Sequence, residues 1–105
     1  EYKSAVDASP EVFGRRVFKL GYHIAAAFAV DGAQTLGLDE CPRYRIVAQE
    51  KHPPYLVSVH DLDDEAMSYS RRLMREAIDI YQRCMDSGKW PGYPAEINTI
   101  PLPLW

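Results

Sequence analysis

The first residues of the sequence are the ones whose types and spacing could do chemistry. Glu1 and Lys3 are separated by a single residue. On a β-strand, side chains two residues apart point to the same face and lie roughly 6.6 Å apart. A carboxylate in that position can hold a hard divalent cation, and an ammonium beside it can polarise water or steady a phosphate oxygen. The pattern is common by chance, so a plain surface ion pair is the alternative.

To act on a substrate, Glu1 and Lys3 must lie beside a cleft, and the surrounding helices and strands must position them there. Residues 1–4 fit the end of a strand that needs neighbours. Ser9, Pro10 and Glu11 are typical of a helix start, with a side-chain cap, proline at the first position and an acid near the positive end of the dipole. Gly21 can divide this helical region into two helices, the second running from Tyr22 to about Leu36. The apolar residues expected to form one stripe along both are Phe13, Val17, Leu20, Ile24 and Phe28.

The second half of the sequence predicts two strands and a long helix. Alternating residues indicate strands over 43–49 and 55–59. The two could form a hairpin, although the connection through residues 51–54 is not a tight-turn sequence. A helix is expected from about Glu65 to Asp86, with an acidic cap supplied by Asp61 to Asp64 and an end at Gly88. Its predicted buried stripe comprises Met67, Met74, Ile78, Tyr81 and Met85. The remaining tail is rich in proline, and we expect its aromatic residues to wrap back over the core rather than to stack on bases; these are Trp90, Tyr93 and Trp105.

Composition sets limits on the class of protein. The chain has 105 residues, which is enough for one domain, and its charged and hydrophobic fractions are ordinary for a globular protein. A net charge of −3 disfavours a general nucleic-acid coat but not a nuclease with a local basic groove. Cys41 and Cys84 form no metal-binding motif; we expect two reduced, buried thiols, with one disulfide as the alternative. Without a signal peptide or a membrane-spanning run, a soluble cytoplasmic protein is expected.

The order of elements is strand end, helix, helix, strand, strand, long helix and tail. This order predicts an α/β fold with a mixed sheet flanked by helices. Because a strand stub is not stable alone, and because the sequence opens abruptly on Glu1, we expect residues 1–105 to be a fragment whose N-terminal part is missing.

Several segments together resemble one nuclease family. They are Glu1-Tyr2-Lys3-Ser4, Gly21-Tyr22-His23, Val47 to Tyr55, Gly88 to Tyr93 and the closing Leu102-Pro103-Leu104-Trp105. In order and over nearly the whole chain, they are similar to the PD-(D/E)xK nucleases related to exonuclease VIII. The resemblance implies a restriction-endonuclease-like core, of which residues 1–105 would be the C-terminal part of a single domain.

The resemblance also implies an activity. In that family an upstream aspartate and the acid of the strand bind Mg²⁺ or Mn²⁺; Glu1 matches that acid and Lys3 the lysine. The expected reaction is hydrolysis of phosphodiester bonds of double-stranded DNA from an end. It serves recombination or phage DNA metabolism and passes single strands to an annealing protein. Relatives form rings, so a homo-oligomer is a further expectation. A fragment without the upstream aspartate should be inactive.

One departure from the family bears on activity. Relatives carry a Tyr-His-x-Gln-x-x-x-Tyr pattern on the helix after the catalytic strand. Tyr22 and His23 match it, but Ala25 and Ala29 stand at the glutamine and the second tyrosine. Alanine makes no side-chain hydrogen bond. A catalytically impaired module that still binds DNA or a partner is therefore the first alternative, and a structural fragment whose likeness is misleading is the second.

Four further residues are candidates for DNA contact. Arg15 and Arg16 lie on the first predicted helix and could meet phosphates, although a solvated helix face explains them equally well. Tyr22 and His23 follow from the resemblance, and for His23 a packed position between a helix and the sheet is the favoured alternative. Lys3 would contact the scissile phosphate.

Overall fold

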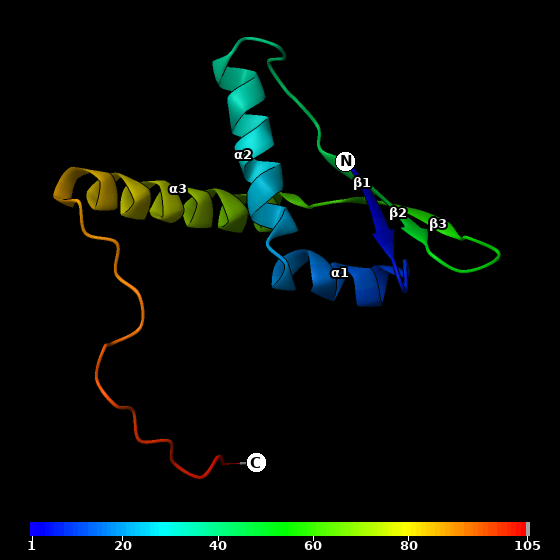
Figure 1. The fold of residues 1–105 in the computed structure, drawn as a ribbon. Coiled ribbons are helices and arrows are strands. Elements are labelled where there is room, and N and C mark those ends of the chain that lie inside the picture. Colours follow the sequence, from blue (N-terminus) through cyan, green and yellow to red (C-terminus); the bar gives the residue numbers. More distant parts are fainter. Residues whose placement is uncertain (105) are drawn as a thin grey trace.

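The computed structural model describes residues 1–104, which form a three-stranded mixed sheet and three helices (Figure 1). An α/β fold with a mixed sheet is confirmed. The elements are β1 (Tyr2–Ala5), α1 (Pro10–Lys19), α2 (Tyr22–Thr35), β2 (Arg45–Glu50), β3 (Val57–Asp61) and α3 (Asp64–Ser87). None of the helices among residues 1–104 combines the length and apolar character needed to cross a bilayer.

The sheet has the order β1-β2-β3. β1 runs parallel to β2, with Lys3 opposite Ala48, and β2 runs antiparallel to β3, with Val47 opposite Val59. The predicted hairpin is confirmed, but both of its strands begin two residues later than expected. In the loop the amide of Tyr55 donates to the carbonyl of His52 at 2.7 Å, so Tyr55 belongs to a turn rather than to the strand.

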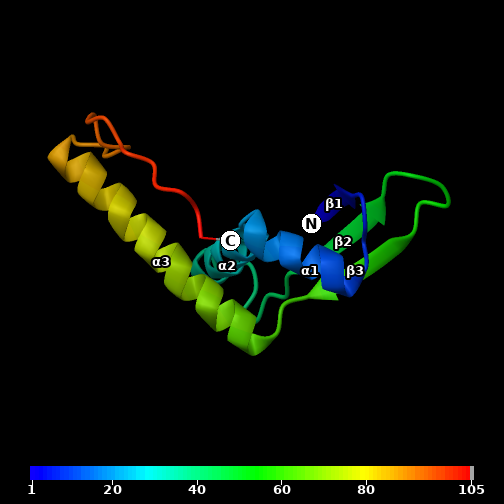
Figure 2. The same cartoon turned by 90° about the horizontal axis from the view of Figure 1, so that it is seen from below.

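The core lies between α1 and one face of the sheet (Figure 2). Phe13 and Val17 are buried on α1, and Ile46 and Ala48 are the buried inward-facing residues of β2. The ring of Phe13 also stacks on the ring of His60 from β3, with centroids 5.0 Å apart. Side chains alternate between the two faces along a strand, so the residues next to Ile46 and Ala48 point to the opposite face of the sheet.

That opposite face of the sheet carries apolar residues without a covering helix. Tyr2, Val57 and Val59 are exposed there, and the Tyr2 hydroxyl donates to Oε1 of Gln49 at 2.7 Å. Val57 and Val59 share a face as expected. Their register opposite Gln49 and Val47 places that face away from α1.

The expected break at Gly21 is confirmed. Gly21 has φ 76°, a conformation that costs glycine little and other residues considerably more. From there α2 turns away from α1 (Figure 1), so the apolar residues of the two helices do not form one stripe. The prediction is wrong for Leu20, which is exposed, and for Phe28, which is 63% exposed.

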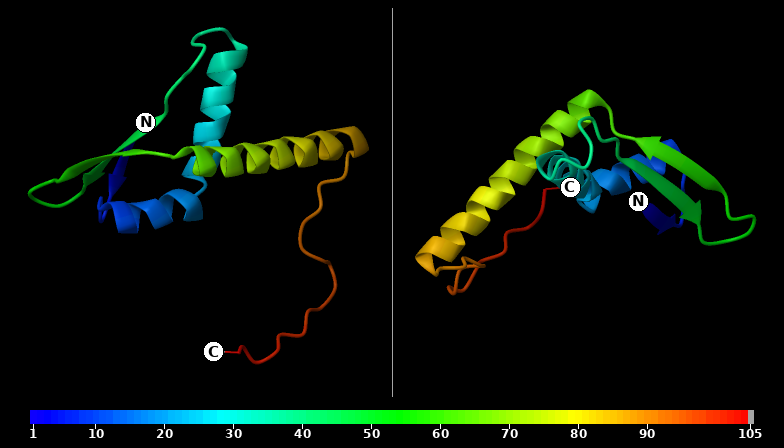
Figure 3. Two further views of the ribbon diagram at one scale, coloured as in Figure 1. Left: turned by 180° about the vertical axis from the view of Figure 1, so that it is seen from behind. Right: turned by 90° about the horizontal axis from the view of Figure 1, so that it is seen from above.

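α3 has the caps that its sequence predicts. The Asp63 side chain accepts from the amide of Ala66 at 2.8 Å, and Gly88 ends the helix at φ 70°. The predicted buried stripe is wrong for Tyr81 and Met85, which are 58% and 56% exposed. α2 crosses α3 over its first half only, where Met74 is buried, and the second half projects beyond it (Figure 3).

The tail does not wrap over the core. Tyr93 is 99% exposed, although Trp90 contacts the ring of Tyr81 at 5.5 Å between centroids. Trp105 lies outside the described residues. Proline fixes φ and removes an amide donor, and the four prolines of residues 91–103 favour an extended backbone.

The two cysteines differ in exposure. Both are free thiols; Cys84 is buried as expected, but the prediction is wrong for Cys41, which is exposed in the loop after α2.

We expect Phe13→Ala to lower the free energy of unfolding by about 3–5 kcal/mol, because it removes a fully buried ring and leaves a cavity against Ile46 and His60. Urea denaturation measures this change. Leu102→Ala, in the exposed tail, is the control and should stay within about 0.5 kcal/mol of the original chain. Equal effects of the two changes would contradict the packing described.

Candidate active site on the first strand

Glu1 and Lys3 lie side by side at β1, an edge strand. The distance between Lys3 Nζ and Glu1 Oε1 is 2.8 Å, and the two side chains are 30% and 37% exposed. The carbonyl of Glu1 accepts from the amide of Val47 at 2.8 Å, which holds the main chain against β2. The spacing in the sequence therefore places a carboxylate and an ammonium in direct contact on one face of the sheet.

Tyr44 holds the other oxygen of Glu1. Its hydroxyl donates to Oε2 of Glu1 at 3.2 Å, and its ring packs against the core next to β2. In the sequence Tyr44 belongs to an alternating strand pattern, and no function was predicted for it. A tyrosine with a buried ring usually finds a partner for its hydroxyl, so its alternation with Ile46 could have indicated a polar contact at this edge.

The ring of Tyr22 supports the side chain of Lys3. Lys3 Nζ lies 4.4 Å from the centroid of the Tyr22 ring, within range of a cation–π contact. Tyr22 is the first residue of α2, and its ring is 6.4 Å from that of Phe13 in the core. The ammonium is thus held between a carboxylate and an aromatic face.

These contacts shift the ionisation of the three groups. The hydrogen bond from Lys3 lowers the pKa of Glu1, and the bond from Tyr44 lowers it further. The hydrogen bond to Glu1 raises the pKa of Lys3. Burial raises the pKa of Tyr44, and the negative charge of Glu1 adds to that effect. At neutral pH the carboxylate and the ammonium are therefore both charged and neutralise one another.

Glu1 offers the chemistry of a magnesium ligand but not a complete site. Mg²⁺ prefers carboxylate and other oxygen donors in octahedral geometry. Among residues 1–104 no group of three or more His, Cys, Asp or Glu side chains could hold an ion together. A metal site that used Glu1 would therefore need ligands beyond a cluster of these side chains in the described residues.

The pair lies on an open surface of this chain. Four pockets in the described part have volumes of about 280–540 Å³, and neither Glu1 nor Lys3 lines any of them. Tyr44 links the pair to the edge of one of these, a pocket of about 370 Å³ that also includes Arg43 and Arg71. None of these four pockets forms the expected cleft beside the pair.

The other candidates for DNA contact occupy different environments. Arg15 and Arg16 are exposed on α1. His23 is 4% exposed; its Nδ1 lies 3.2 Å from the carbonyl oxygen of Val17, and its ring stacks on Tyr69 of α3 at 6.0 Å. His23 is therefore a packed residue, as the favoured alternative predicted. It lies between helices, however, and not between a helix and the sheet.

The two alanines lie on an exposed side of α2. Ala25 and Ala29 follow Tyr22 by three and seven residues, so all three share one stripe of the helix. Side chains at these positions would extend from the same helix face as the ring that supports Lys3. A glutamine and a tyrosine at these positions could form side-chain hydrogen bonds, whereas two methyl groups cannot.

A scan of the chain against protein-family models finds no match, and a search of curated proteins also finds none.

We expect Lys3→Met to raise the pKa of Glu1 toward its ordinary value, since it removes both the hydrogen bond and the positive charge that favour the carboxylate. Tyr44→Phe should raise it by a smaller amount. A carbon-13 NMR titration of the Glu1 carboxyl measures both changes.

The matched control is Tyr2→Phe, which removes a hydroxyl bonded to Gln49 on the opposite face of the sheet and should leave the titration of Glu1 unchanged. A Glu1 carboxyl that titrates identically in all four proteins would show that the contacts of Lys3 and Tyr44 with it do not persist in solution.

Proposed function

We propose that this chain carries part of the active site of a metal-dependent exodeoxyribonuclease with a PD-(D/E)xK core. The observation that carries the proposal is the contact of Glu1 with Lys3 on one face of β1 at 2.8 Å. The chain would be the C-terminal part of the domain, and its substrate would be the ends of double-stranded DNA. The α/β architecture with a mixed sheet is compatible with such a core but is shared by many unrelated proteins.

In this proposal each residue has a separate task. Glu1 supplies one carboxylate ligand for Mg²⁺ or Mn²⁺, and Lys3 holds an oxygen of the scissile phosphate or the attacking water. A bound divalent ion would supply a Lewis acid and a more acidic water. The ion pair between the two is exposed, and such pairs are worth at most about 1 kcal/mol, so an ion and a phosphate can replace it at little cost.

The two tyrosines would act as positioning residues. Tyr44 keeps one oxygen of Glu1 bonded when Lys3 turns to the phosphate, so the carboxylate retains its orientation. Tyr22 presents its ring to the Lys3 ammonium, which restricts where that charge can lie. Tyr22 begins α2 and Tyr44 directly precedes β2, and both rings pack against the core, which restricts their movement.

Ala25 and Ala29 favour a second candidate, a nuclease fold that binds DNA or a partner without cleaving it. Both alanines lie on the stripe of α2 that begins at Tyr22, where polar side chains would help to order water or DNA. The two candidates differ in metal binding. A functional site takes up Mn²⁺ through Glu1, whereas a non-catalytic module need not.

The cellular setting is part of the same proposal. A nuclease that produces single strands from DNA ends would act in the cytoplasm of its cell and pass its product to a single-strand annealing protein. Arg15 and Arg16, exposed on α1, would contribute contacts to the phosphate backbone.

In the full-length protein that contains this chain, we expect Glu1→Gln to lower the rate of end degradation by at least about a hundredfold, since the amide cannot replace an anionic metal ligand. Lys3→Ala should have a loss of similar size. Release of nucleotides from end-labelled linear duplex DNA with Mg²⁺ or Mn²⁺ measures the rate. Tyr2→Phe, on the opposite face of the sheet, serves as the control with unchanged activity.

Calorimetric titration of Mn²⁺ into the same proteins separates the two candidate functions. An original protein that neither takes up Mn²⁺ nor trims DNA ends, but still binds duplex DNA, would favour the non-catalytic module. Full activity of the Glu1→Gln protein would exclude the nuclease proposal.

The isolated 105-residue chain should show no nuclease activity, because the upstream aspartate of the proposed family is absent from it and no group of three or more His, Cys, Asp or Glu side chains among the described residues could hold an ion. The same DNA-end assay applies. Robust metal-dependent degradation by the purified chain would contradict the assignment of the remaining ligands to other sequence.

A further inference from the structure

The second half of α3 exposes an apolar stripe. We define the α3 stripe as Ile78, Tyr81 and Met85, which recur at steps of three and four residues and therefore share one side of the helix. Tyr81 and Met85 are more than half exposed, and Ile78 is half-buried. The stripe continues the side on which Met74 is buried under α2, so this side is suited to packing against a helix.

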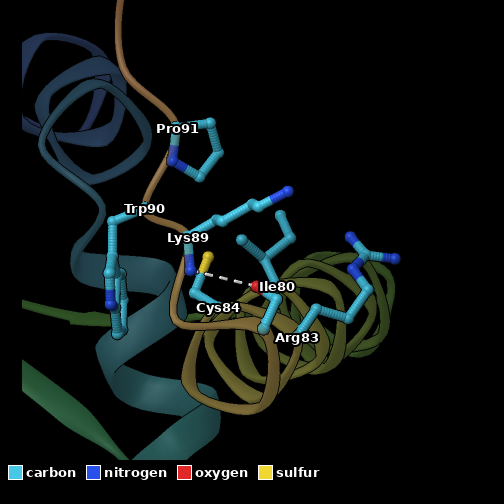
Figure 4. A pocket seen from close by; sticks show the side chains of 7 residues that line it. Ile80, Arg83, Cys84, Lys89, Trp90 and Pro91 are labelled. Carbon is cyan, nitrogen blue, oxygen red and sulfur yellow. Dashed lines mark hydrogen bonds between the residues drawn. The ribbon is translucent and has the colours of Figure 1, made fainter.

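The chain covers only one flank of this stripe. After Gly88, Trp90 lies against the ring of Tyr81, with centroids 5.5 Å apart. Figure 4 shows Trp90 on the side of α3 that carries the buried Cys84. The other flank carries Arg75 and Asp86, both exposed, and nothing in the described residues packs there. Figure 3 shows this half of α3 projecting away from the sheet and from α1.

The surface of the chain is larger than a protein of this size normally exposes. Its accessible area is 8623 Å², whereas a folded monomer of this mass exposes about 6,000 Å². Its radius of gyration is 18.1 Å, against about 13 Å for a compact domain of this length. Part of the excess is the extended tail, and part is the projecting half of α3. The excess is larger than the roughly 800 Å² per partner that a stable interface buries.

We propose that the α3 stripe is the interface of a homodimer, in which two copies of this chain pack their α3 helices antiparallel. The two-fold axis lies beside Tyr81, so each copy lays its stripe on that of the other. Such an interface is isologous, since the same residues supply both sides.

Charge complementarity favours a second copy as the occupant and sets the register. Arg75 and Asp86 are eleven residues apart by their numbers (86 minus 75), close to three helical turns, so they lie on the same flank of the stripe. A two-fold axis midway between them brings each Arg75 next to Asp86 of the partner subunit. That midpoint falls next to Tyr81. The side chain of Gln82 already orients Asp86 toward this flank, with Nε2 donating to Oδ1 at 2.9 Å.

In this arrangement burial of the apolar stripe provides the affinity, and the charges of Arg75 and Asp86 determine how the two α3 helices are aligned. Exposed ion pairs contribute little free energy but disfavour alignments that bring like charges together. The antiparallel register gives two Arg75–Asp86 pairs by symmetry. A parallel two-fold alignment would instead place this flank of the two copies on opposite sides of the interface, so that Arg75 and Asp86 would not meet.

Sedimentation velocity of the purified 105-residue chain over a wide range of concentrations tests the proposal. A monomer–dimer equilibrium is expected, and Tyr81→Asp should weaken it roughly a hundredfold by placing a charge at the centre of the stripe. Ile100→Asp makes a comparable change at an exposed tail residue and should leave the equilibrium unchanged. Circular dichroism checks that both variants keep their helices.

Single charge reversals test the register without threatening the fold, because both residues are exposed. Arg75→Glu and Asp86→Arg should each weaken self-association about tenfold. An equimolar mixture of these two variants should recover it, since the heterodimer contains only opposite-charge contacts.

A chain that remains monomeric at every concentration would overturn the proposal and leave the stripe to another molecule. Self-association that survives Tyr81→Asp, or a mixture of the two reversed variants that fails to recover, would equally overturn it. None of these outcomes depends on metal or DNA, so they are independent of the proposed nuclease activity.

Discussion

The pairing of β1 with β2 is the constraint on which the candidate site depends. β1 has four residues and neighbours on one side only, so its backbone order comes from the parallel ladder with β2 and from Ala5, which is buried in the core. That core exists because Phe13 and Val17 of α1 close over Ile46 and Ala48. A loss of this packing would release β1, and Glu1 and Lys3 would no longer be held on one face.

The opposite charges of Glu1 and Lys3 cancel at β1, so this pair carries no net charge until another group displaces their contact. Lys3 lies between the carboxylate of Glu1 and the ring of Tyr22, and Tyr44 holds the second carboxylate oxygen. The pair is partly exposed, so its net contribution to stability is small. Under the proposed function it could be exchanged for contacts with an ion and a phosphate without unfolding the strand, which a buried ion pair would not allow as readily.

The sheet and α3 are each covered by a helix over one part of their surface and exposed to solvent over another. α1 covers one face of the sheet, and α2 covers the first half of α3; the outer face of the sheet and the second half of α3 keep apolar side chains in solvent. The stability of the chain therefore rests on two small cores. For the α3 stripe, the arrangement of Arg75 and Asp86 indicates a partner of the same sequence.

The sequence by itself determined the type and order of the elements, because these depend on local chemistry. Helical spacing, the cap at Asp63 and the terminator Gly88 specify α3, and Gly21 separates α1 from α2 through a backbone conformation that suits glycine. The contact of Glu1 with Lys3 also follows from the alternation of side chains along a strand.

Only the tertiary structure decided which apolar residues are covered and what surrounds the pair. Tyr81 and Phe28 have the spacing of buried residues, but their exposure depends on the angle at which α2 leaves α1 and crosses α3, which no local pattern encodes. The partners of Glu1 and Lys3 likewise come from α2 and from the residue before β2, more than forty positions from Glu1 in the case of Tyr44. Contacts at that separation depend on the register between strands, and this register follows from the packing of the whole chain.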